Sequence, residues 1–165
     1  NLMFTLRRAA KLFGRRAASL TSSGPITWDA YFQRAHRAAA FLDQLGIQAG
    51  DRVAVLMLNS HEYLELYHAT MIRGAIIVPL NIRWNLDDFA FAINDSESIA
   101  VVLDDRFVPL LQGLRERCPG VRRWIFAGTG EHPAGMADWS SGVAAADLVE
   151  YPEPGELDVV GIFYT

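Results

Sequence analysis

The sequence predicts a doubly wound α/β fold, in which a mostly parallel sheet carries helices on both faces. Short, uniformly apolar runs recur along the chain, and the segments between them have apolar residues every three or four positions. Runs without alternation are typical of strands that are covered on both faces. Strands that alternate with helices join as right-handed crossovers between parallel neighbours, which gives this fold class.

The expected strands share this apolar character and a length typical of strands. They are residues 53–58, 75–80, 99–103 and 124–126, with a further strand at 158–165. A turn signal, Ser22-Ser23-Gly24-Pro25, also predicts a small hairpin within residues 19–27. Doubly wound sheets bind ligands beyond the carboxyl ends of their strands, so a site is expected at that edge.

The expected helices are marked by capping residues at their starts. They are residues 27–45, 61–73, a helix that starts after Asn85, residues 107–117, and a short helix at 140–149. Thr27, either Asn59 or Ser60, and Asn85 are expected to accept hydrogen bonds from the free N–H groups of the first turns. Gly74 is expected to end the second of these helices.

The start of the chain is strongly basic, since no acidic residue occurs before Asp29. The basic residues there are Arg7, Arg8, Lys11, Arg15 and Arg16. The apolar residues among them have the spacing of one helical face, and they are Leu2, Leu6, Ala9, Phe13 and Ala17. We predict a basic amphipathic helix over residues 1–18 that packs its apolar side on the domain. An organelle-targeting peptide and a membrane-surface contact are the alternatives.

Composition excludes several classes of protein. A chain of 165 residues that is 51% hydrophobic has enough apolar surface for one packed core. The net charge of −4, with both signs interspersed, argues against a nucleic acid partner. Cys118 is the single cysteine, which excludes an internal disulfide or a cysteine-cluster metal site and indicates a cytoplasmic, reducing location. No apolar run approaches the roughly 18 residues of a membrane-spanning helix.

Two weak patterns in the sequence resemble binding sites. The Gly128-Thr129-Gly130 segment follows a strand, but Pro133 takes the third glycine position of a dinucleotide-binding loop, so we interpret it as a plain loop. His61, Glu65 and His68 share one helix face at a spacing that suits a metal ion. We interpret them instead as the solvated face, because Tyr63, Leu64, Tyr67 and Met71 are expected to face the core. No catalytic and no metal-ligating residue is therefore expected.

A series of short segments carries more information than any single motif. The segments are Ile26-Thr27-Trp28, residues 45–55 (LGIQAGDRVAV), 58–63 (LNSHEY), 73–81 (RGAIIVPLN), 93–96 (INDS), 99–104 (IAVVLD) and 162–165 (IFYT). In order and spacing they resemble the N-terminal subdomain of adenylate-forming enzymes, the family of acyl-CoA synthetases, luciferases and peptide-synthetase adenylation domains. Leu58 departs from the proline that is usual in the family, which alters a turn only.

The resemblance implies a domain organisation. Residues 1–165 would form the N-terminal subdomain of an AMP-binding synthetase, with the basic helix at 1–18, an α/β core at 19–150, and a linker and strand at 151–165. That strand would lead into the family's phosphate loop, T-S-G-T-T-G-x-P-K-G, of which only the first residue, Thr165, is present. The resemblance therefore implies a phosphate-binding role for Thr165 and a natural polypeptide that continues beyond it.

The resemblance also implies a function. Within the family, the sequence most resembles fatty acyl-CoA synthetases. These enzymes use ATP and Mg²⁺ to convert a carboxylic acid to an acyl adenylate and then transfer the acyl group to CoA. The expected substrate is a medium or long chain fatty acid, and the fragment by itself is expected to be inactive. A homodimer and a peripheral membrane contact are further expectations about partners.

Two other classes of protein fit the residues. A stand-alone α/β binding or dimerisation module would use exposed apolar edges for self-association and would have no catalytic activity. An unrelated nucleotide-binding domain of flavodoxin or Rossmann type would bind flavin or NAD. Ligand binding raises the thermal midpoint of a native protein, so a ligand screen would separate this last alternative from the others.

Overall fold

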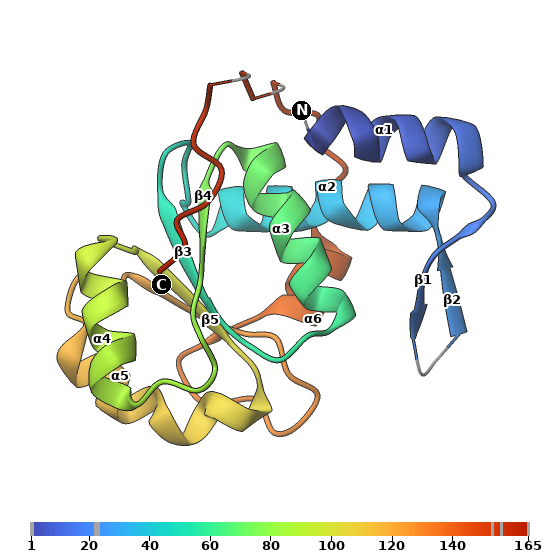
Figure 1. Cartoon of the computed structure of the whole chain (residues 1–165). Helices are drawn as coiled ribbons and strands as arrows, with labels where there is room; N and C mark the ends of the chain where they lie inside the picture. Colours follow the sequence, from blue (N-terminus) through green and yellow to red (C-terminus); the bar gives the residue numbers. More distant parts are fainter. Residues whose placement is uncertain (1, 22–23, 153, 156, 165) are drawn as a thin grey trace.

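The computed structural model describes residues 2–21, 24–152, 154–155 and 157–164. Its main sheet has five parallel strands in the order β4-β3-β5-β6-β7 (Figure 1). The strands are β3 Arg52–Leu56, β4 Ile76–Pro79, β5 Ala100–Leu103, β6 Arg123–Phe126 and β7 Ala137–Asp138. A separate antiparallel hairpin pairs β1, Ala17–Thr21, with β2, Gly24–Thr27. The predicted parallel sheet and hairpin are confirmed, although Ser22 and Ser23 of the turn lie outside the described residues.

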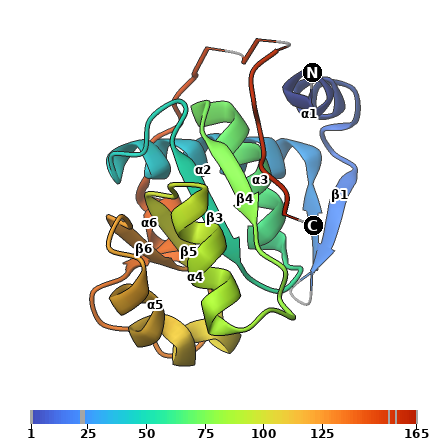
Figure 2. The same ribbon diagram turned by 60° about the vertical axis from the view of Figure 1, so that its left-hand side comes forward.

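Helices cover both faces of the sheet. They are α1 Leu2–Phe13, α2 Trp28–Gln44, α3 His61–Arg73, α4 Leu86–Asp95, α5 Leu111–Arg117 and α6 Trp139–Ala145, with a 3₁₀ helix, η1, at Asp105–Leu110. One core lies between the sheet and α2, α3 and α6, and a second lies between the opposite face and α4, η1 and α5 (Figures 1 and 2). The doubly wound architecture is therefore confirmed.

The predicted capping residues begin and end the helices as expected. The Thr27 side chain accepts from the N–H of Ala30, and the Ser60 side chain accepts from the N–H of Tyr63. Asn85 forms a reciprocal capping box with Asp88 at the start of α4. Gly74 ends α3 with φ of 75°, a conformation that favours glycine.

Three helices differ from their predicted bounds. The short helix expected at 140–149 ends at Ala145. The expected helix at 107–117 is split, because Pro109 lies inside η1 and has no N–H to donate, and regular α-helix begins only at Leu111. The helix at the start of the chain ends at Phe13, short of the predicted residue 18, and a strand begins at Ala17. The chain turns at Gly14, whose carbonyl accepts from the N–H of Asp29 at the start of α2.

The strand predicted at 158–165 is wrong for the described residues of that segment. Gly161 makes a single parallel bridge with Ile77 of β4, flanked by hydrogen bonds from Ile77 N to Val160 O and from Ile162 N to Ile77 O. The next rung of a parallel ladder would need the N–H two residues further along β4, and that residue is Pro79. Proline therefore limits this pairing to one rung.

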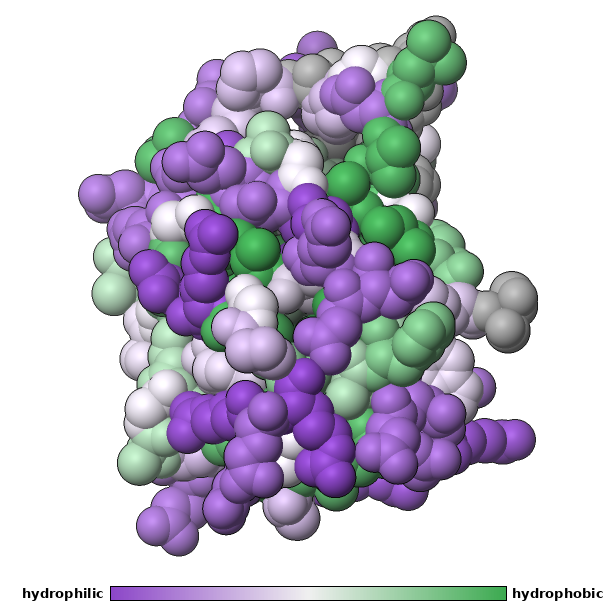
Figure 3. Space-filling view, turned by 90° about the vertical axis from the view of Figure 1, so that its left-hand side faces the viewer, coloured by the Kyte–Doolittle hydropathy of each residue, from purple (hydrophilic) through white to green (hydrophobic). Residues whose placement is uncertain are grey.

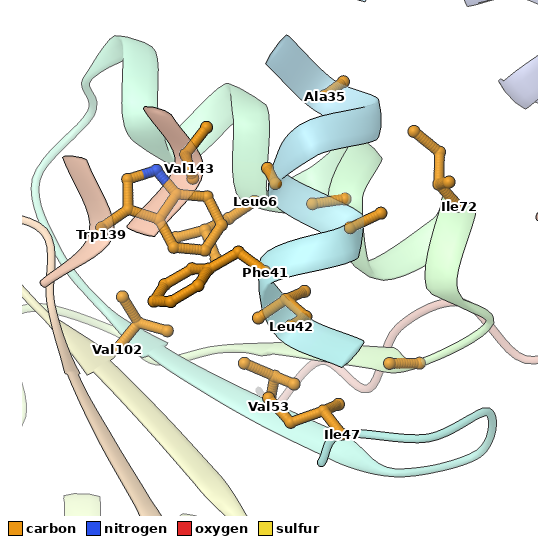
Figure 4. Packing of buried hydrophobic residues seen from close by; sticks show 14 of the residues in the cluster. Ala35, Phe41, Leu42, Ile47, Val53, Leu66, Ile72, Val102, Trp139 and Val143 are labelled. Atoms are coloured by element: carbon orange, nitrogen blue, oxygen red, sulfur yellow. The ribbon is translucent and has the colours of Figure 1, made fainter. Parts of the chain in front are cut away.

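The larger core is centred on two aromatic rings that pack edge to face. Phe41 of α2 and Trp139 of α6 have ring centroids 5.9 Å apart, and Trp139 is fully buried. Figure 4 shows both rings between α2, α6 and the sheet, with Val143 and Val102 close by. Gly142, on the same helix as Trp139, leaves room for this arrangement, because a Cβ there would lie 2.2 Å from Cε2 of Phe41.

This contact predicts that Gly142→Ala destabilises the protein, although alanine is normally the better helix former. The added methyl overpacks the Phe41 ring, so we expect a loss of about 1–3 kcal/mol in the free energy of unfolding. Chemical denaturation followed by tryptophan fluorescence measures it. Gly120→Ala is the matched control, since a Cβ there meets nothing within 4 Å. An unchanged or raised stability of Gly142→Ala would show that the ring moves aside without cost.

Candidate functional site at the carboxyl edge of the sheet

A topological switch point lies at the carboxyl edge of the sheet, between β3 and β5. The chain leaves β3 toward α3 on one face, whereas it leaves the neighbouring strand β5 toward η1 and α5 on the other face. In doubly wound folds a crevice opens between two such strands and commonly receives the ligand.

The crevice between β3 and β5 is bridged by a carboxylate. Asp104, directly after β5, accepts from the N–H of Leu58 at 2.7 Å through Oδ2 and from the N–H of Arg106 at 3.0 Å through Oδ1. Both carboxylate oxygens therefore hold backbone of this molecule, one from the loop after β3 and one from the first turn of η1. Asp104 has a structural function here, in that it fixes the two loops relative to each other.

The Gly128-Thr129-Gly130 loop is organised in the same way by the next residue. The Asp105 carboxylate accepts from the N–H of Thr129 and from the N–H of Gly130, both at 2.8 Å. The bond from Thr129 is the main cause that lowers the pKa of Asp105 below its ordinary value. A Cβ on Gly128 or Gly130 would lie 2.6 Å or less from Asp105 atoms, so these glycines make room for a carboxylate of the protein itself. The N–H groups of Thr129 and Gly130 are thus already bound within the protein, which agrees with a plain loop.

The segment at residues 158–164 approaches the same edge from the side of β4. Because its bridge to Ile77 is parallel, it runs in the direction of β4, toward the carboxyl ends of the strands. Thr165, the predicted phosphate-binding residue, lies outside the described residues. Its role remains a prediction, and the direction of the preceding residues is the structural observation that bears on it.

Apolar side chains are exposed beside this segment. Val159, Phe163 and, on α4, Phe91 each expose more than 60% of their surface. Tyr164 lies across α4, where its hydroxyl donates to Asp95 at 2.7 Å and its ring centroid lies 6.5 Å from that of Phe91. Figure 3, which shows the molecule from the side of α4 and β4, has hydrophobic side chains exposed among hydrophilic ones on this face. Exposed apolar surface of this kind is typical of a region that another protein surface covers.

The other candidate group, His61, Glu65 and His68, is placed differently from the prediction. Glu65 is fully buried and His68 is partly buried, whereas Leu64, expected in the core, is 48% exposed. The interpretation of these polar residues as a solvated face was therefore wrong. They face α2, where Tyr31 and Arg34 provide polar partners for His68 and Glu65.

Glu65 is held by three partners from three elements. Arg34 of α2 donates from Nε and Nη2 to the two carboxylate oxygens. The indole N–H of Trp139 donates to Oε2 at 3.2 Å, and His61 Nε2 lies 2.7 Å from Oε1. Burial by itself would raise the pKa of Glu65, but His61 and Arg34 outweigh burial and lower it. The group is a buried ion pair that joins α2, α3 and α6.

His68 belongs to a separate hydrogen-bond group. Tyr31 donates from its hydroxyl to the carbonyl of Leu64 at 2.8 Å, and the same hydroxyl lies 2.7 Å from His68 Nδ1. Burial lowers the pKa of His68, so its imidazole is neutral at neutral pH. Among the residues that the structure describes, no group of three or more His, Cys, Asp or Glu side chains has the geometry of a metal site.

Comparison with known proteins identifies the family. The model of the AMP-binding enzyme family matches residues 6–165, so the chain belongs to this family. It is 32% identical to a long-chain-fatty-acid–CoA ligase of Thermus thermophilus over 93% of this chain, and 26% identical to a medium-chain-fatty-acid–CoA ligase of Ectopseudomonas oleovorans over 97%. It covers 29% and 31% of those two proteins, so it spans less than a third of their length.

A solved structure supports the same assignment. The N-terminal domain of FACL13 from Mycobacterium tuberculosis is 30% identical and superposes with a TM-score of 0.87. The similarity covers 100% of this chain and 41% of that one. The resemblance to fatty acyl-CoA synthetases, the α/β fold and the membership in the adenylate-forming family are confirmed by these matches.

The buried ion pair leads to a prediction for Glu65→Gln. The variant removes the charge that Arg34 faces, and breaking a buried pair costs roughly 3–5 kcal/mol. Since the Arg34 side chain is 36% exposed and regains some hydration, we expect the lower end of that range, about 3 kcal/mol. Urea unfolding measures the change. Glu97→Gln is the matched control, because Glu97 pairs with Arg52 with its side chain 83% exposed, and we expect less than about 1 kcal/mol there.

The pH dependence of stability in the wild type and in Glu65→Gln gives a second test of this ion pair. The pKa of Glu65 is lower in the folded state than its ordinary value of 4.5, so its contribution to stability is complete above that pH. The contribution is lost as pH falls from 4.5 through the folded pKa. Wild-type stability should therefore fall more steeply in this range than that of Glu65→Gln. Parallel curves would show that Glu65 does not carry the charge described here.

A third prediction concerns Asp105 and its loop. Asp105→Ala removes the acceptor of two backbone N–H groups, and hydrogen bonds to a charged acceptor are worth enough to slow local opening roughly tenfold or more. We expect amide hydrogen exchange at Thr129 and Gly130 to accelerate by that factor, while exchange in β5 is unchanged. Glu131→Ala, an exposed residue of the same loop, is the control. Equal exchange in both variants would contradict the proposed role of Asp105.

Proposed function

We propose that this chain is part of an ATP-dependent fatty acid:CoA ligase. The observation that carries the proposal is family membership over residues 6–165, together with 32% identity to a protein named as a long-chain-fatty-acid–CoA ligase. Because the chain spans only 29% of that relative, the activity belongs to the proposal and to the complete protein.

The chemistry follows from the poor reactivity of a carboxylate. Its leaving group in acyl transfer would be oxide or hydroxide, so the acid must first be joined to a better leaving group. Transfer of AMP from ATP, with release of pyrophosphate, gives an acyl adenylate whose carbonyl a thiol attacks with AMP as the leaving group. Coenzyme A supplies the thiol, and Mg²⁺ would balance the charge of the triphosphate.

The described residues do not by themselves form an ATP site. At the carboxyl edge, the backbone N–H groups of Leu58, Thr129 and Gly130 already donate to Asp104 and Asp105. We therefore propose that this part is a scaffold and that it is inactive alone. The proposal includes phosphate binding by Thr165 at the start of a loop, supported by the parallel course of residues 158–164 along β4.

The proposed substrate is a medium or long chain fatty acid. It is supported by the names of the relatives, which include long-chain and medium-chain ligases. A cytoplasmic location is also part of the proposal, supported by a single, buried cysteine, Cys118, whose thiol pKa is raised by burial. Within the described residues, every helix is too short or too polar to cross a bilayer.

A pyrophosphate-release assay tests the proposal. The complete protein that contains this sequence is supplied with ATP, Mg²⁺, CoA and a panel of carboxylic acids that differ in chain length. We expect release that requires an acid of medium or long chain, and no release with the methyl ester of the same acid, which has no carboxylate to adenylate. The chain of residues 1–165 alone should give none. Absence of acid-dependent release from the complete protein would refute the proposal, and a tight dimer of the chain that ignores ATP would favour a stand-alone module.

A further inference from the structure

The exposed side of α1 and the turn after it form a basic surface with apolar side chains in it. We call it the α1 patch, and it consists of Arg8, Lys11, Leu12, Phe13, Arg15 and Arg16. All six residues are exposed, with Leu12 at 57% and Phe13 at 44%. The Arg16 guanidinium lies 5.4 Å from the centre of the Phe13 ring, so cationic and apolar groups are direct neighbours.

The other side of α1 is already used for packing. Leu6 is 1% exposed and belongs to the core that α2 and α3 form. Figure 2 shows α1 nearly along its axis, at a corner of the molecule, with one side toward α2 and α3 and the other side free of protein. The α1 patch therefore lies on the side of the helix that is turned away from this core.

The distribution of charge along the chain indicates which kind of surface the α1 patch would bind. The whole chain has a net charge of −4, yet residues 1–28 carry five basic and no acidic residues, so residues 29–165 carry a net −9. An anionic surface would attract the α1 patch and repel most of the remaining molecule, which orients the protein with α1 toward that surface.

We propose that the α1 patch binds the surface of a bilayer that contains anionic phospholipid. Four cations are within the range of basic clusters that recognise such membranes. Leu12 and Phe13 would enter the boundary between headgroups and acyl chains, where an amphipathic helix lies parallel to the membrane plane. Between the aliphatic stems of Arg8, Lys11 and their neighbours Arg7 and Leu12 lies a surface hollow of about 450 Å³. Nucleic acid would use the cations but would leave the exposed leucine without an apolar environment.

Vesicle co-sedimentation of the chain tests the proposal. One set of vesicles is phosphatidylcholine alone, and the other is an equimolar mixture of phosphatidylcholine and phosphatidylglycerol. We expect binding to the mixed vesicles only, and weaker binding at high salt. Arg8→Glu with Lys11→Glu should weaken it by about 25-fold or more, at roughly fivefold for each basic residue. The assay uses neither ATP nor CoA, so its outcome is independent of ligase activity.

Matched controls separate the patch from net charge and from general stickiness. Arg83→Glu with Arg122→Glu makes the same charge change at two exposed residues, before α4 and before β6, and should bind nearly as wild type does. Leu12→Ser should weaken binding, whereas Leu148→Ser, at a leucine 53% exposed, should not. Circular dichroism verifies that each variant is folded. Equal loss in both charge-reversed pairs, equal binding to both kinds of vesicle, or binding to duplex DNA but not to vesicles would overturn the proposal.

Discussion

The ion pair around Glu65 is the interaction on which the helical layer of the larger core depends. A carboxylate with no exposed surface is tolerable only if polar groups replace its water. Here Arg34 of α2 and Trp139 of α6 donate to it, and His61 of α3 lies beside it. If any of these helices shifts, the charge loses a partner. The pair therefore specifies one relative position of the three helices, whereas apolar contacts such as that between Phe41 and Trp139 would tolerate small slips.

The same interaction explains where the sequence misleads. Periodicity identifies the bounds of α3 well, because the Ser60 cap and Gly74 are local signals. It places Met71 in the core correctly, but it misplaces Leu64 and counts Glu65 and His61 as solvent-facing. Their burial depends on Arg34 and Trp139, which lie 31 and 74 positions from Glu65 in the chain. A pairing at such distance leaves no trace in the local pattern.

Some strands could be predicted from their own residues, whereas others depend on the strand with which they pair. The runs that form β3, β4 and β5 are apolar throughout because helices cover both of their faces, and this makes them visible in the sequence. β7 has only two residues, too few for any pattern, and it exists because it pairs with β6. Residues 158–164 have the composition of a strand, but Pro79 on the neighbouring strand removes the next hydrogen bond. Pairing is a property of two strands, and one strand's sequence shows only half of it.

At the candidate site, the sequence indicated the correct edge but not the function of its polar groups. Asp104 and Asp105 follow a buried strand, a place where catalytic or ligand-binding residues often lie. The carboxylate oxygens of both accept hydrogen bonds from backbone N–H groups of this protein. These hydrogen bonds hold the loops of the edge in place, and they take up backbone N–H groups that a phosphate would otherwise need. A rigid edge with the open strand β4 beside it is what a scaffold needs if the reactive groups come from elsewhere in a longer protein. If the complete protein is the ligase proposed above, this part would position a site that it does not itself complete.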